Sequence, residues 1–412
     1  MRKPKICVVI PTRERADTLL SSVQTCIDQD YDDLEILICD NYSQDDTLSV
    51  VKSLTDARIH YINPGQRLSM SDNWEYALSQ VKADYVTFIG DDDGLFPQAI
   101  SDLVDLIDSH SASIVTWKKV EYCWPNHLAP HLRNYLSIPL RNRLTKISST
   151  LALRHIYNFY LGYSRGPCIY NSIVSMRHVR DVITRDGKFF QSACPDIYSS
   201  LALASVTDGY LFSSRPFSVN GASAHSNGTS FHRPEVDQAA FQKFLAEYTH
   251  EKVGFHDIHG SITAAVADSL AEFSKHAKAK APNMPRKRAF KKIIKELQRD
   301  SGLLKNNQEA IYVMAQRYRL QSYVHSLYTR ASIRAQQATV YAENDYPLID
   351  GDNVAFWGDR FMLSNVTDAC RFSEKILGAY APPTLTGKYS LANMLLTKAI
   401  AKAPRISRNL GL

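Results

Sequence analysis

Apolar residues in the first 117 positions fall into short runs separated by longer amphipathic stretches. The runs are rich in β-branched and aromatic residues, which predicts buried strands. They occupy residues 5–10, 35–39, 59–62, 85–89 and 113–117. Strands that alternate with helical stretches in this way favour a mostly parallel sheet with helices on both faces.

The stretches between these strands repeat apolar residues at three- or four-residue spacing, the period of one helix face. Acidic or hydroxyl side chains near their starts are candidate helix caps: Asp17, Asp45 or Asp46, and Ser71 or Asp72. The side chains expected to point inward are Leu19, Leu20, Val23, Cys26, Ile27, Leu48, Val51, Leu54, Trp74, Ala77, Leu78, Val81, Ile100, Leu103, Val104 and Ile107.

The rest of the chain changes character twice. Residues 126–235 mix apolar runs with loop-like segments such as "NGASAHSNGTS", and residues 236–412 are mostly helical in pattern. We therefore expect an α/β half over 1–125, a second half of the same domain over 126–235 and a helical C-terminal region over 236–412. Two segments of that region, 275–299 and 388–408, are strongly basic.

The composition is that of an ordinary globular protein, with 412 residues, 44% hydrophobic, 22% charged and a net charge of +6. No apolar stretch approaches the roughly 18 residues that indicate a transmembrane helix. The 7 cysteines are scattered without a CxxC pair, which argues against a disulfide framework or a zinc site and suits a reducing cytoplasm. Neither a GxGxxG turn after the first strand nor a P-loop is present, so a Rossmann dehydrogenase or a P-loop kinase is not expected.

Polar residues concentrate where predicted strands end, and in such sheets ligands bind outside the carboxyl ends of the strands. The first strand is followed by "PTRER", the second by "DNYSQDD" and the fourth by "GDDDG". Adjacent carboxylates at Asp91, Asp92 and Asp93 repel one another, so a divalent cation together with a substrate diphosphate best accounts for them. Capping of the following helix is the alternative, but one Asp would suffice for it.

The segment "VVIPTRERADTLLSSVQTCIDQDYDDLEILICDNYSQDDT", followed by "YVTFIGDDDGLFP", resembles the nucleotide-sugar domain of family 2 glycosyltransferases. The resemblance implies the GT-A fold, an α/β fold with a Rossmann-like, mostly parallel sheet flanked by helices. It also implies a nucleoside-diphosphate sugar donor, most often UDP-linked in the family, and Mn²⁺ or Mg²⁺ as cofactor. The family suggests a bacterial role in surface polysaccharide or glycoconjugate synthesis, with a saccharide, a lipid-linked or a protein acceptor.

In that family the first strand ends in a Pro-Thr or Pro-Ala turn whose backbone touches the nucleobase and the ribose. Pro11 and Thr12 match this turn, and the resemblance assigns the arginines that follow, Arg13 and Arg15, to the donor site as well. Arg67, after the third strand, is a candidate contact to the diphosphate.

The family's second strand ends in an Asp that hydrogen-bonds the base and is usually followed by Asp or Asn. Asp40 and Asn41 match these positions. A carboxylate accepts well from the one N–H donor of a uracil edge. An Asx-turn after the strand is the alternative for Asp40.

The family's metal motif is Asp-x-Asp, often with a further Asp, before apolar residues and a Pro. With Pro97 aligned, Asp92 and Asp93 match the last two aspartates, Gly90 stands at the first Asp position and Asp91 at the variable one. We expect Asp92 to be the direct metal ligand, with Asp91 and Asp93 assisting it, and we expect Asp91 to lie at the donor as well.

Two later residues complete the expected site. The family carries an acidic pair at the start of a helix, and in "SACPDIYSSLALAS" Asp196 matches its second position while Pro195 replaces the first. Asp196 is then the general base that deprotonates the acceptor hydroxyl, which gives inversion in one displacement, and a helix N-cap is the alternative. His225 is a candidate metal ligand through its neutral imidazole, or else an ordinary surface residue.

Other functions stay open on the sequence. The departures at Gly90 and Pro195 are compatible with a non-catalytic nucleotide-sugar or glycan-binding protein, and a sugar nucleotidyltransferase would also use aspartates and Mg²⁺. The basic residues of 275–299 either face solvent or attract an anionic membrane surface, which would place the protein at the inner face of the cell membrane. Nucleic acid is not an expected partner, because the charge is modest and no stacking platform accompanies it.

Overall fold

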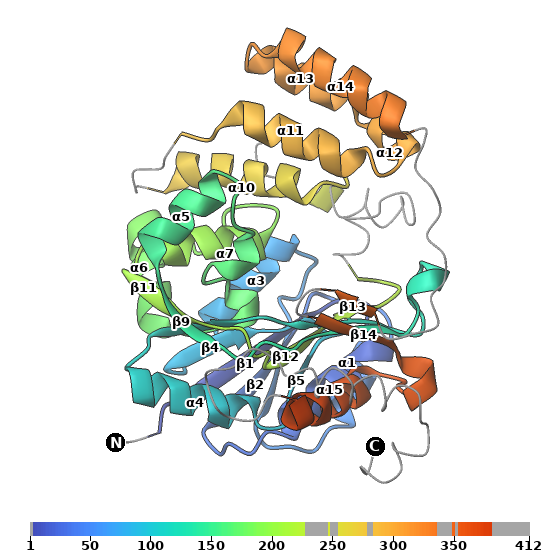
Figure 1. Cartoon of the computed structure of the whole chain (residues 1–412). Coiled ribbons are helices and arrows are strands. Elements are labelled where there is room, and N and C mark those ends of the chain that lie inside the picture. Colours follow the sequence, from blue (N-terminus) through green and yellow to red (C-terminus); the bar gives the residue numbers. More distant parts are fainter. Residues whose placement is uncertain are drawn as a thin grey trace.

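The computed structural model describes residues 3–226, 246–247, 254–277, 283–335, 348–350 and 353–380. Two sheets, the helices that cover them and a stack of helices at one end make up this part of the chain (Figure 1). The basic segment 388–408 lies outside the described residues, as does part of 275–299. The boundaries expected at residues 125 and 235 stay predictions.

The larger sheet has eight strands among the described residues, in the order β3-β2-β1-β4-β10-β6-β11-β9. Their bounds are β1 Ile6–Thr12, β2 Leu34–Asp40, β3 Ile59–Ile62, β4 Tyr85–Phe88, β6 Ile114–Trp117, β9 Leu144–Ser148, β10 Ser172–Ser175 and β11 Gly209–Ser213. Strands β1 to β4 pair in parallel, as do β6 and β11, whereas β10 runs antiparallel between β4 and β6. The five strands predicted from the apolar runs and the mostly parallel sheet are confirmed.

The smaller sheet has six strands in the described ranges, in the order β13-β14-β8-β7-β12-β5. Their bounds are β5 Gly94–Leu95, β7 Val120–Cys123, β8 Tyr135–Pro139, β12 Ser218–Ala222, β13 Leu348–Asp350 and β14 Asn353–Trp357. Strand β14 pairs antiparallel with β8, with Asn353 opposite Pro139 and Trp357 opposite Tyr135. Two strands from the late part of the chain therefore complete a sheet begun more than two hundred residues earlier, which the sequence pattern did not indicate.

Some helices cover both faces of the larger sheet, and the others pack on the smaller sheet or form the stack. Their bounds are α1 Ala16–Ile27, α2 Thr47–Lys52, α3 Met70–Ser79, α4 Ala99–His110, α5 Ser149–Tyr157, α6 Met176–Asp186, α7 Pro195–Ala204, α10 Ile262–His276, α11 Arg286–Leu297, α12 Ser301–Asn306, α13 Gln308–Arg317, α14 Gln321–Ala335 and α15 Val366–Tyr380. Along β1, Val8 packs on the side of α1 and α4, and Val9 packs on the side of α3. A strand buried on both faces reads as a continuous apolar run, which explains the pattern in the sequence.

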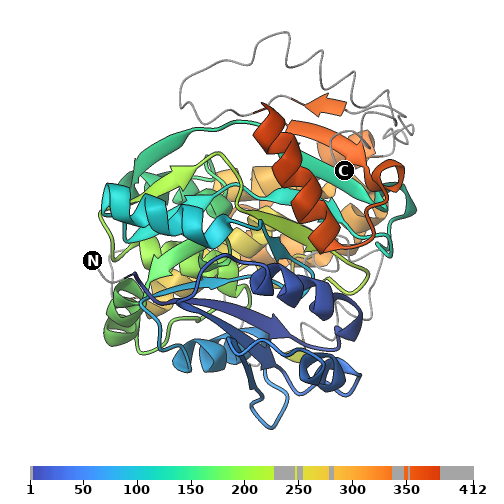
Figure 2. The ribbon, with the colours of Figure 1, turned by 90° about the horizontal axis from the view of Figure 1, so that it is seen from below.

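Helix α15 returns to the N-terminal half and lies beside α1 (Figure 2). The hydroxyl of Thr367 donates to the carbonyl of Ser21 at 2.9 Å, and Arg371 pairs with Asp28 at 2.8 Å. The last described helix is thus part of the α/β core rather than of the helical stack.

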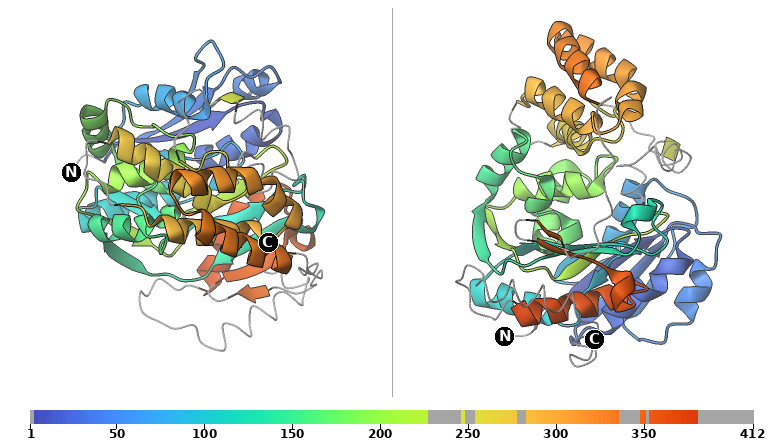
Figure 3. Two further views of the ribbon diagram at one scale, coloured as in Figure 1. Left: turned by 90° about the horizontal axis from the view of Figure 1, so that it is seen from above. Right: turned by 45° about the vertical axis from the view of Figure 1, so that its right-hand side comes forward.

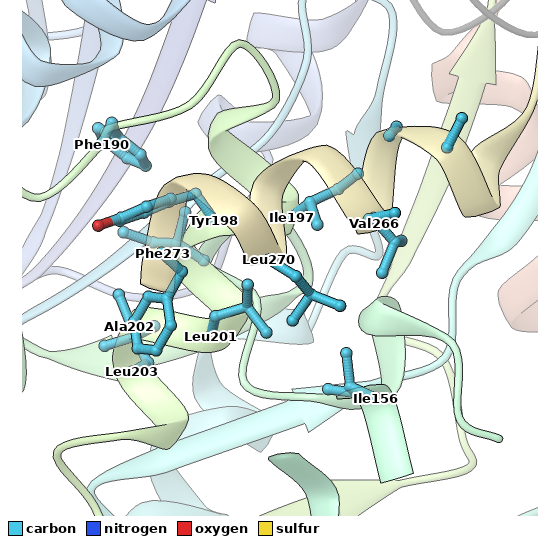
Figure 4. Close-up of a cluster of buried hydrophobic side chains, with 14 of the residues drawn as sticks. Ile156, Phe190, Ile197, Tyr198, Leu201, Ala202, Leu203, Val266, Leu270 and Phe273 are labelled. Atoms are coloured by element: carbon cyan, nitrogen blue, oxygen red, sulfur yellow. The ribbon is translucent and has the colours of Figure 1, made fainter. Parts of the chain in front are cut away.

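The helical stack lies on the far side of α7 from the sheets (Figure 3). Helix α10 packs directly on α7, and Figure 4 shows Ile197, Leu201, Leu270 and Phe273 in one buried cluster between them. Each buried side chain of this size contributes on the order of 1.5–3 kcal/mol relative to an exposed one. This packing fixes α7, and α7 carries Asp196 in its first turn.

Several helix starts differ from prediction by one to three residues. Helix α3 begins at Met70 with Ser69 as its N-cap, because the Ser69 hydroxyl accepts from the backbone N–H of Asp72 at 3.2 Å. Arg15, not Asp17, precedes α1. The prediction that Leu20 and Leu48 point inward was wrong, because they are 47% and 41% exposed.

All 7 cysteines are free thiols, in agreement with the predicted absence of a disulfide framework. A membrane-crossing helix is not found in the described ranges, where every helix is too short or too polar to span a bilayer.

Candidate active site

A cavity of about 1140 Å³ opens where β1 and β4 end, and the first residues of α7 and α10 form its opposite wall. This is the edge of a parallel sheet at which ligands bind. A smaller cavity of about 220 Å³ adjoins it, and Lys119, Glu121 and Ser164 line both.

Most residues predicted for the site meet at the larger cavity. Those that line it are Pro11, Thr12, Arg13, Arg15, Asn41, Arg67, Asp91, Asp92, Asp196 and His225. Asp40 and Asp93 are not among its lining residues.

The three aspartates after β4 point in different directions. Asp93 turns away from the cavity, because its Oδ1 accepts from the backbone N–H of Gly221 and its Oδ2 from that of Gly90, both at 2.7 Å. Asp93 thus ties the turn to β12 and does not line the cavity, and its role at a metal stays a prediction. Asp91 and Asp92 line the cavity and are both buried.

Gly90 explains the departure from the family's metal motif. A Cβ at this position would lie 2.6 Å from the hydroxyl oxygen of Tyr170 and 3.1 Å from a carboxylate oxygen of Asp93. The space that an Asp side chain would need is therefore filled by a Tyr hydroxyl, and Gly is the residue that fits.

Burial makes the aspartates costly to ionise. Burial, the largest cause, acts together with the charge of Asp92 to raise the pKa of Asp93 to about 7 and that of Asp91 to about 6. The opposing effect of Arg15 favours the ionised form of Asp91, and that of Lys119 favours the ionised form of Asp93. The turn is thus a place where an additional cation would be stabilising.

Arg15 is the cation that lies closest to these carboxylates in the described structure. Its Nη1 is 3.6 Å from Asp91 Oδ1 and 3.5 Å from Asp92 Oδ2. The same nitrogen donates to Ser223 Oγ at 3.1 Å, and Nη2 donates to the carbonyl of His225. The Arg15 side chain is buried, with the residue only 7% exposed.

Asp196 lies in the first turn of α7, and Cys194 rather than Asp196 is the residue at the N-cap position. The alternative that Asp196 is an N-cap is therefore wrong. One carboxylate oxygen, Oδ2, accepts from the hydroxyl of Tyr163 at 2.9 Å. Tyr163 belongs to the 3₁₀ turn Tyr163–Arg165 and also lines the cavity. Burial and the nearby Asp196 raise the pKa of Tyr163 well above its usual value, so Tyr163 is the donor in this pair.

Two arginines predicted for the donor share one carboxylate partner. Arg13 donates to Glu247, and Arg67 Nε lies 3.2 Å from the other oxygen of the same carboxylate. Arg67 also pairs with Glu14 at 3.6 Å. Both guanidinium groups line the cavity and are neutralised by carboxylates of the chain itself.

Asp40 is held within the end of β2. Its Oδ1 accepts from the backbone N–H of Ser43 at 3.0 Å, and its Oδ2 accepts from the hydroxyl of Tyr61 at 2.7 Å. These bonds support the alternative of a local turn, and they place Asp40 beside the cavity rather than in its wall. Asn41, next to it, clamps the loop at Leu68 by two backbone hydrogen bonds of 2.8 Å and does line the cavity.

The predicted metal ligands do not form a preassembled set. Among the described residues, no group of three or more His, Cys, Asp and Glu side chains is placed to hold a metal ion. Asp92 faces the cavity and Asp93 does not, and His225 is exposed at its edge. A cation here would have to rely on Asp91 and Asp92 together with oxygens from a ligand.

Sequence reasoning missed three groups that shape the site. Tyr163 contacts Asp196, Tyr170 fills the space beside Gly90, and Ser223 donates to Asp92 Oδ2 through both its backbone N–H (3.1 Å) and its hydroxyl (2.7 Å). Hydroxyl groups on loops carry no periodic signal, so nothing in one sequence marks them.

Comparison with known proteins finds similarity in the part of the chain that contains these strand ends. Residues 7–169 match the family model described as glycosyl transferase family 2. Over 104 residues the chain is 38% identical to GalNAc(5)-diNAcBac-PP-undecaprenol beta-1,3-glucosyltransferase of Campylobacter jejuni, covering 24% of this chain and 34% of that protein. It is 27% identical over 104 residues to UDP-Glc:alpha-D-GlcNAc-diphosphoundecaprenol beta-1,3-glucosyltransferase WfaP of Escherichia coli, covering 25% of this chain and 41% of that protein. The chain thus spans less than half the length of either relative.

Among solved structures, TarS 1–349 of S. aureus in complex with UDP-GlcNAc is 15% identical, with a TM-score of 0.46 over 86% of this chain and 97% of that one. Mannosyltransferase PcManGT from Pyrobaculum calidifontis, in complex with GDP-Man and Mn²⁺, is 15% identical, with a TM-score of 0.43 over 82% and 87%. Likenesses this distant add nothing to the family match.

The family match runs from β1 through the aspartate turn and the Tyr163 turn. It therefore includes the three strand ends, after β1, β2 and β4, whose side chains surround the cavity. Residues 7–169 therefore match the model of glycosyltransferase family 2, and the described residues show the mostly parallel α/β sheet expected of the GT-A fold.

Proposed function

We propose that this protein is a metal-dependent, inverting glycosyltransferase that moves a sugar from a nucleoside-diphosphate sugar to a hydroxyl acceptor. The observation that carries the proposal is that Asp91 and Asp92, after β4, line the same cavity as Asp196, on α7. In one wall of the cavity, Asp91 and Asp92 are placed to bind a cation that would in turn bind the diphosphate of the donor. In another wall, Asp196 is placed to accept a proton.

Asp91 and Asp92 are the residues that would hold Mg²⁺ or Mn²⁺. Such ions are commonly bound by one or two carboxylates plus substrate phosphates, so a set of two carboxylates fits them. Burial, the first cause, and the charge of Asp92 raise the pKa of Asp91 although Arg15 opposes the shift, so a further cation at this carboxylate would be stabilising. When bound, the cation would stabilise the charge that develops on the departing diphosphate.

We assign to Asp196 the role of the base that accepts the proton of the acceptor hydroxyl. As the acceptor oxygen forms its bond to the anomeric carbon, the acceptor O–H proton passes to Asp196, and the bond between the anomeric carbon and the diphosphate oxygen breaks with its electron pair on the nucleotide. One displacement of this kind inverts the anomeric configuration. Because Tyr163 donates to Oδ2, we assign the acceptor hydroxyl to Oδ1.

A UDP-sugar is the favoured donor, because the name of the E. coli relative specifies UDP-Glc. The names of both relatives specify acceptors linked through a diphosphate to undecaprenol. We therefore favour a lipid-linked saccharide acceptor in bacterial surface glycan synthesis over a protein acceptor. A peripheral position at the inner face of the membrane would bring the enzyme to such an acceptor, and exposed lysines of α11 support it.

The test is calorimetric titration of UDP, GDP, TDP and CDP, each with and without Mn²⁺, into the wild type and Asp92→Ala. We expect one nucleotide, UDP, to bind, and we expect its affinity to depend on both Mn²⁺ and Asp92. If none of the four nucleotides binds the wild type in a metal-dependent way, the proposed donor site is wrong.

The alternatives predict different products. Asp196→Asn is expected to bind UDP and Mn²⁺ normally but to transfer sugar about 10²–10⁴-fold more slowly, the usual range for a missing general base. A non-catalytic binding protein would bind UDP with no transfer in either form. A sugar nucleotidyltransferase would release inorganic diphosphate from a nucleoside triphosphate and a sugar phosphate.

A further inference from the structure

One arginine of the chain itself partly neutralises the two carboxylates after β4 that line the cavity. Asp91 and Asp92 are 8% and 5% exposed, and Arg15 Nη1 lies 3.6 and 3.5 Å from them. A guanidinium stays charged at any ordinary pH. With both carboxylates ionised the trio carries one net negative charge, so the pull on a free divalent cation is weaker than that of two unpaired carboxylates.

The Arg15 guanidinium is attracted by the two carboxylates and is also held in one orientation by hydrogen bonds. Its two terminal nitrogens donate to Ser223 Oγ and to the carbonyl of His225. Ser223 in turn donates to Asp92 Oδ2. Arg15 therefore joins the start of α1, the turn after β4 and the segment after β12 in one buried network.

This network puts a positive charge where a divalent ion on Asp92 would bind. Two cations held by the same carboxylate oxygen repel each other strongly in a buried, poorly screened place. Arg15 lines the cavity, and a guanidinium pairs with phosphate oxygens through two parallel hydrogen bonds. When a divalent cation binds the carboxylates, the donor diphosphate would thus replace those carboxylates as the partner of Arg15.

We propose that Arg15 is the resident counter-ion of Asp91 and Asp92, and that it passes to the donor diphosphate when a divalent cation binds. This inference rests on the proposed function, because it needs a diphosphate and a cation in one cavity. It implies that cation and nucleotide bind cooperatively and that each raises the affinity of the other by the same factor.

The test measures Mn²⁺ binding without nucleotide, from the electron paramagnetic resonance signal of free Mn²⁺. Arg15→Met is expected to bind Mn²⁺ tighter than the wild type, by about tenfold, within the usual range of such couplings. Arg67→Met is the matched control, because Arg67 lines the same cavity but pairs with Glu14 and Glu247 instead. Its Mn²⁺ affinity should stay within twofold of the wild type, on the order of experimental scatter.

A second comparison adds UDP. UDP should raise the Mn²⁺ affinity of the wild type more than that of Arg15→Met, because the variant has no guanidinium that must first leave the two carboxylates. Arg15→Lys keeps the charge but lacks the planar fork. It is therefore expected to bind Mn²⁺ alone as the wild type does and to lose part of the effect of UDP, which keeps the test available if the Met variant does not fold.

Equal or weaker Mn²⁺ binding by a folded Arg15→Met would overturn the counter-ion role. A wild type that binds Mn²⁺ but no nucleotide would overturn the proposed function instead, and the Mn²⁺ affinities without nucleotide would still decide the role of Arg15.

Discussion

Neighbouring aspartates of one turn serve different purposes in this protein. Asp93 accepts two backbone N–H groups and holds the turn against β12, whereas Asp91 and Asp92 face the cavity. A buried carboxylate that accepts two backbone donors is expected to be structural, because removing it would leave those donors unsatisfied.

At the residue scale, Tyr163 is expected to act as a positioning residue for Asp196. Tyr163→Phe removes the 2.9 Å hydrogen bond to Oδ2 and leaves the ring in place. We expect kcat to fall about tenfold, the equivalent of one lost hydrogen bond, with the affinity for UDP and Mn²⁺ unchanged. Steady-state kinetics with calorimetry on the same samples separates the two effects.

Tyr160→Phe is the matched control, because Tyr160 is 66% exposed and is not among the cavity residues. It should leave both kcat and nucleotide affinity unchanged. A Tyr163→Phe variant with weakened UDP binding and normal kcat would contradict the positioning role.

The type of residue in each strand end was predictable, and the direction of its side chain was not. Asp92 and Asp196 meet at the cavity as predicted, because strand and helix periodicity place them at ends that face it. The direction of Asp93 depends on Gly221, and the position of Asp40 depends on Tyr61. Such contacts between separate elements leave no trace in the local pattern.

At the element scale, periodicity found the strands that are buried on both faces and most helices of the α/β part. It missed β13 and β14, because short strands that pair with a distant partner have only a weak local signal. The helical pattern expected over 236–412 includes α15, but nothing in that pattern indicated that α15 packs beside α1. Periodicity also placed Leu20 and Leu48 inward, although both are exposed. Each lies at the edge of an apolar face, where spacing alone cannot separate core from surface.

The close approach of β12 to the aspartate turn gives an element-scale prediction. A Cβ on Gly221 would lie 1.8 Å from the carbonyl oxygen of Asp92, so the strand or the turn must move. Gly221→Ala is expected to lower the free energy of unfolding by about 1–3 kcal/mol, the usual cost of overpacking. It should also weaken Mn²⁺-dependent UDP binding, and thermal unfolding with calorimetry measures both.

Gly378→Ala on α15 provides the control, because nothing lies within 4 Å of the added Cβ and the glycine is helical. Ala in a helix interior is favoured over Gly by about 0.5–1 kcal/mol, so this variant should be as stable as the wild type or more so. A Gly221→Ala protein of wild-type stability would mean that β12 and the turn separate easily.

At the scale of the whole molecule, the charge is concentrated in the helical stack. Residues 283–335 carry 12 Lys and Arg against 3 Asp and Glu, a net +9, while the whole chain carries +6. On α11, Lys287, Lys291 and Lys295 are exposed and lie four residues apart, so they share one helix face. This face favours an anionic membrane surface as partner.

Co-sedimentation with lipid vesicles tests that partner. We expect binding to vesicles that contain phosphatidylglycerol and little binding to pure phosphatidylcholine. The double charge reversal Lys291→Glu with Lys295→Glu should weaken binding at least about tenfold, since each lysine near an anionic surface contributes roughly 1 kcal/mol. Lys52→Glu with Lys82→Glu makes the same change in net charge at two exposed sites of the α/β part and should bind as the wild type does.

The pairing of β14 with β8 has a consequence for how the chain is made. Until Asn353–Trp357 leaves the ribosome, β8 is an open sheet edge with unpaired backbone groups, since β14 is its outer neighbour. At roughly 5–20 residues per second, translation of the intervening segment takes on the order of 10–40 s. During that interval the nascent protein exposes a template for pairing with other chains. Newly made copies are thus expected to need a chaperone that covers this sheet edge until β14 is in place.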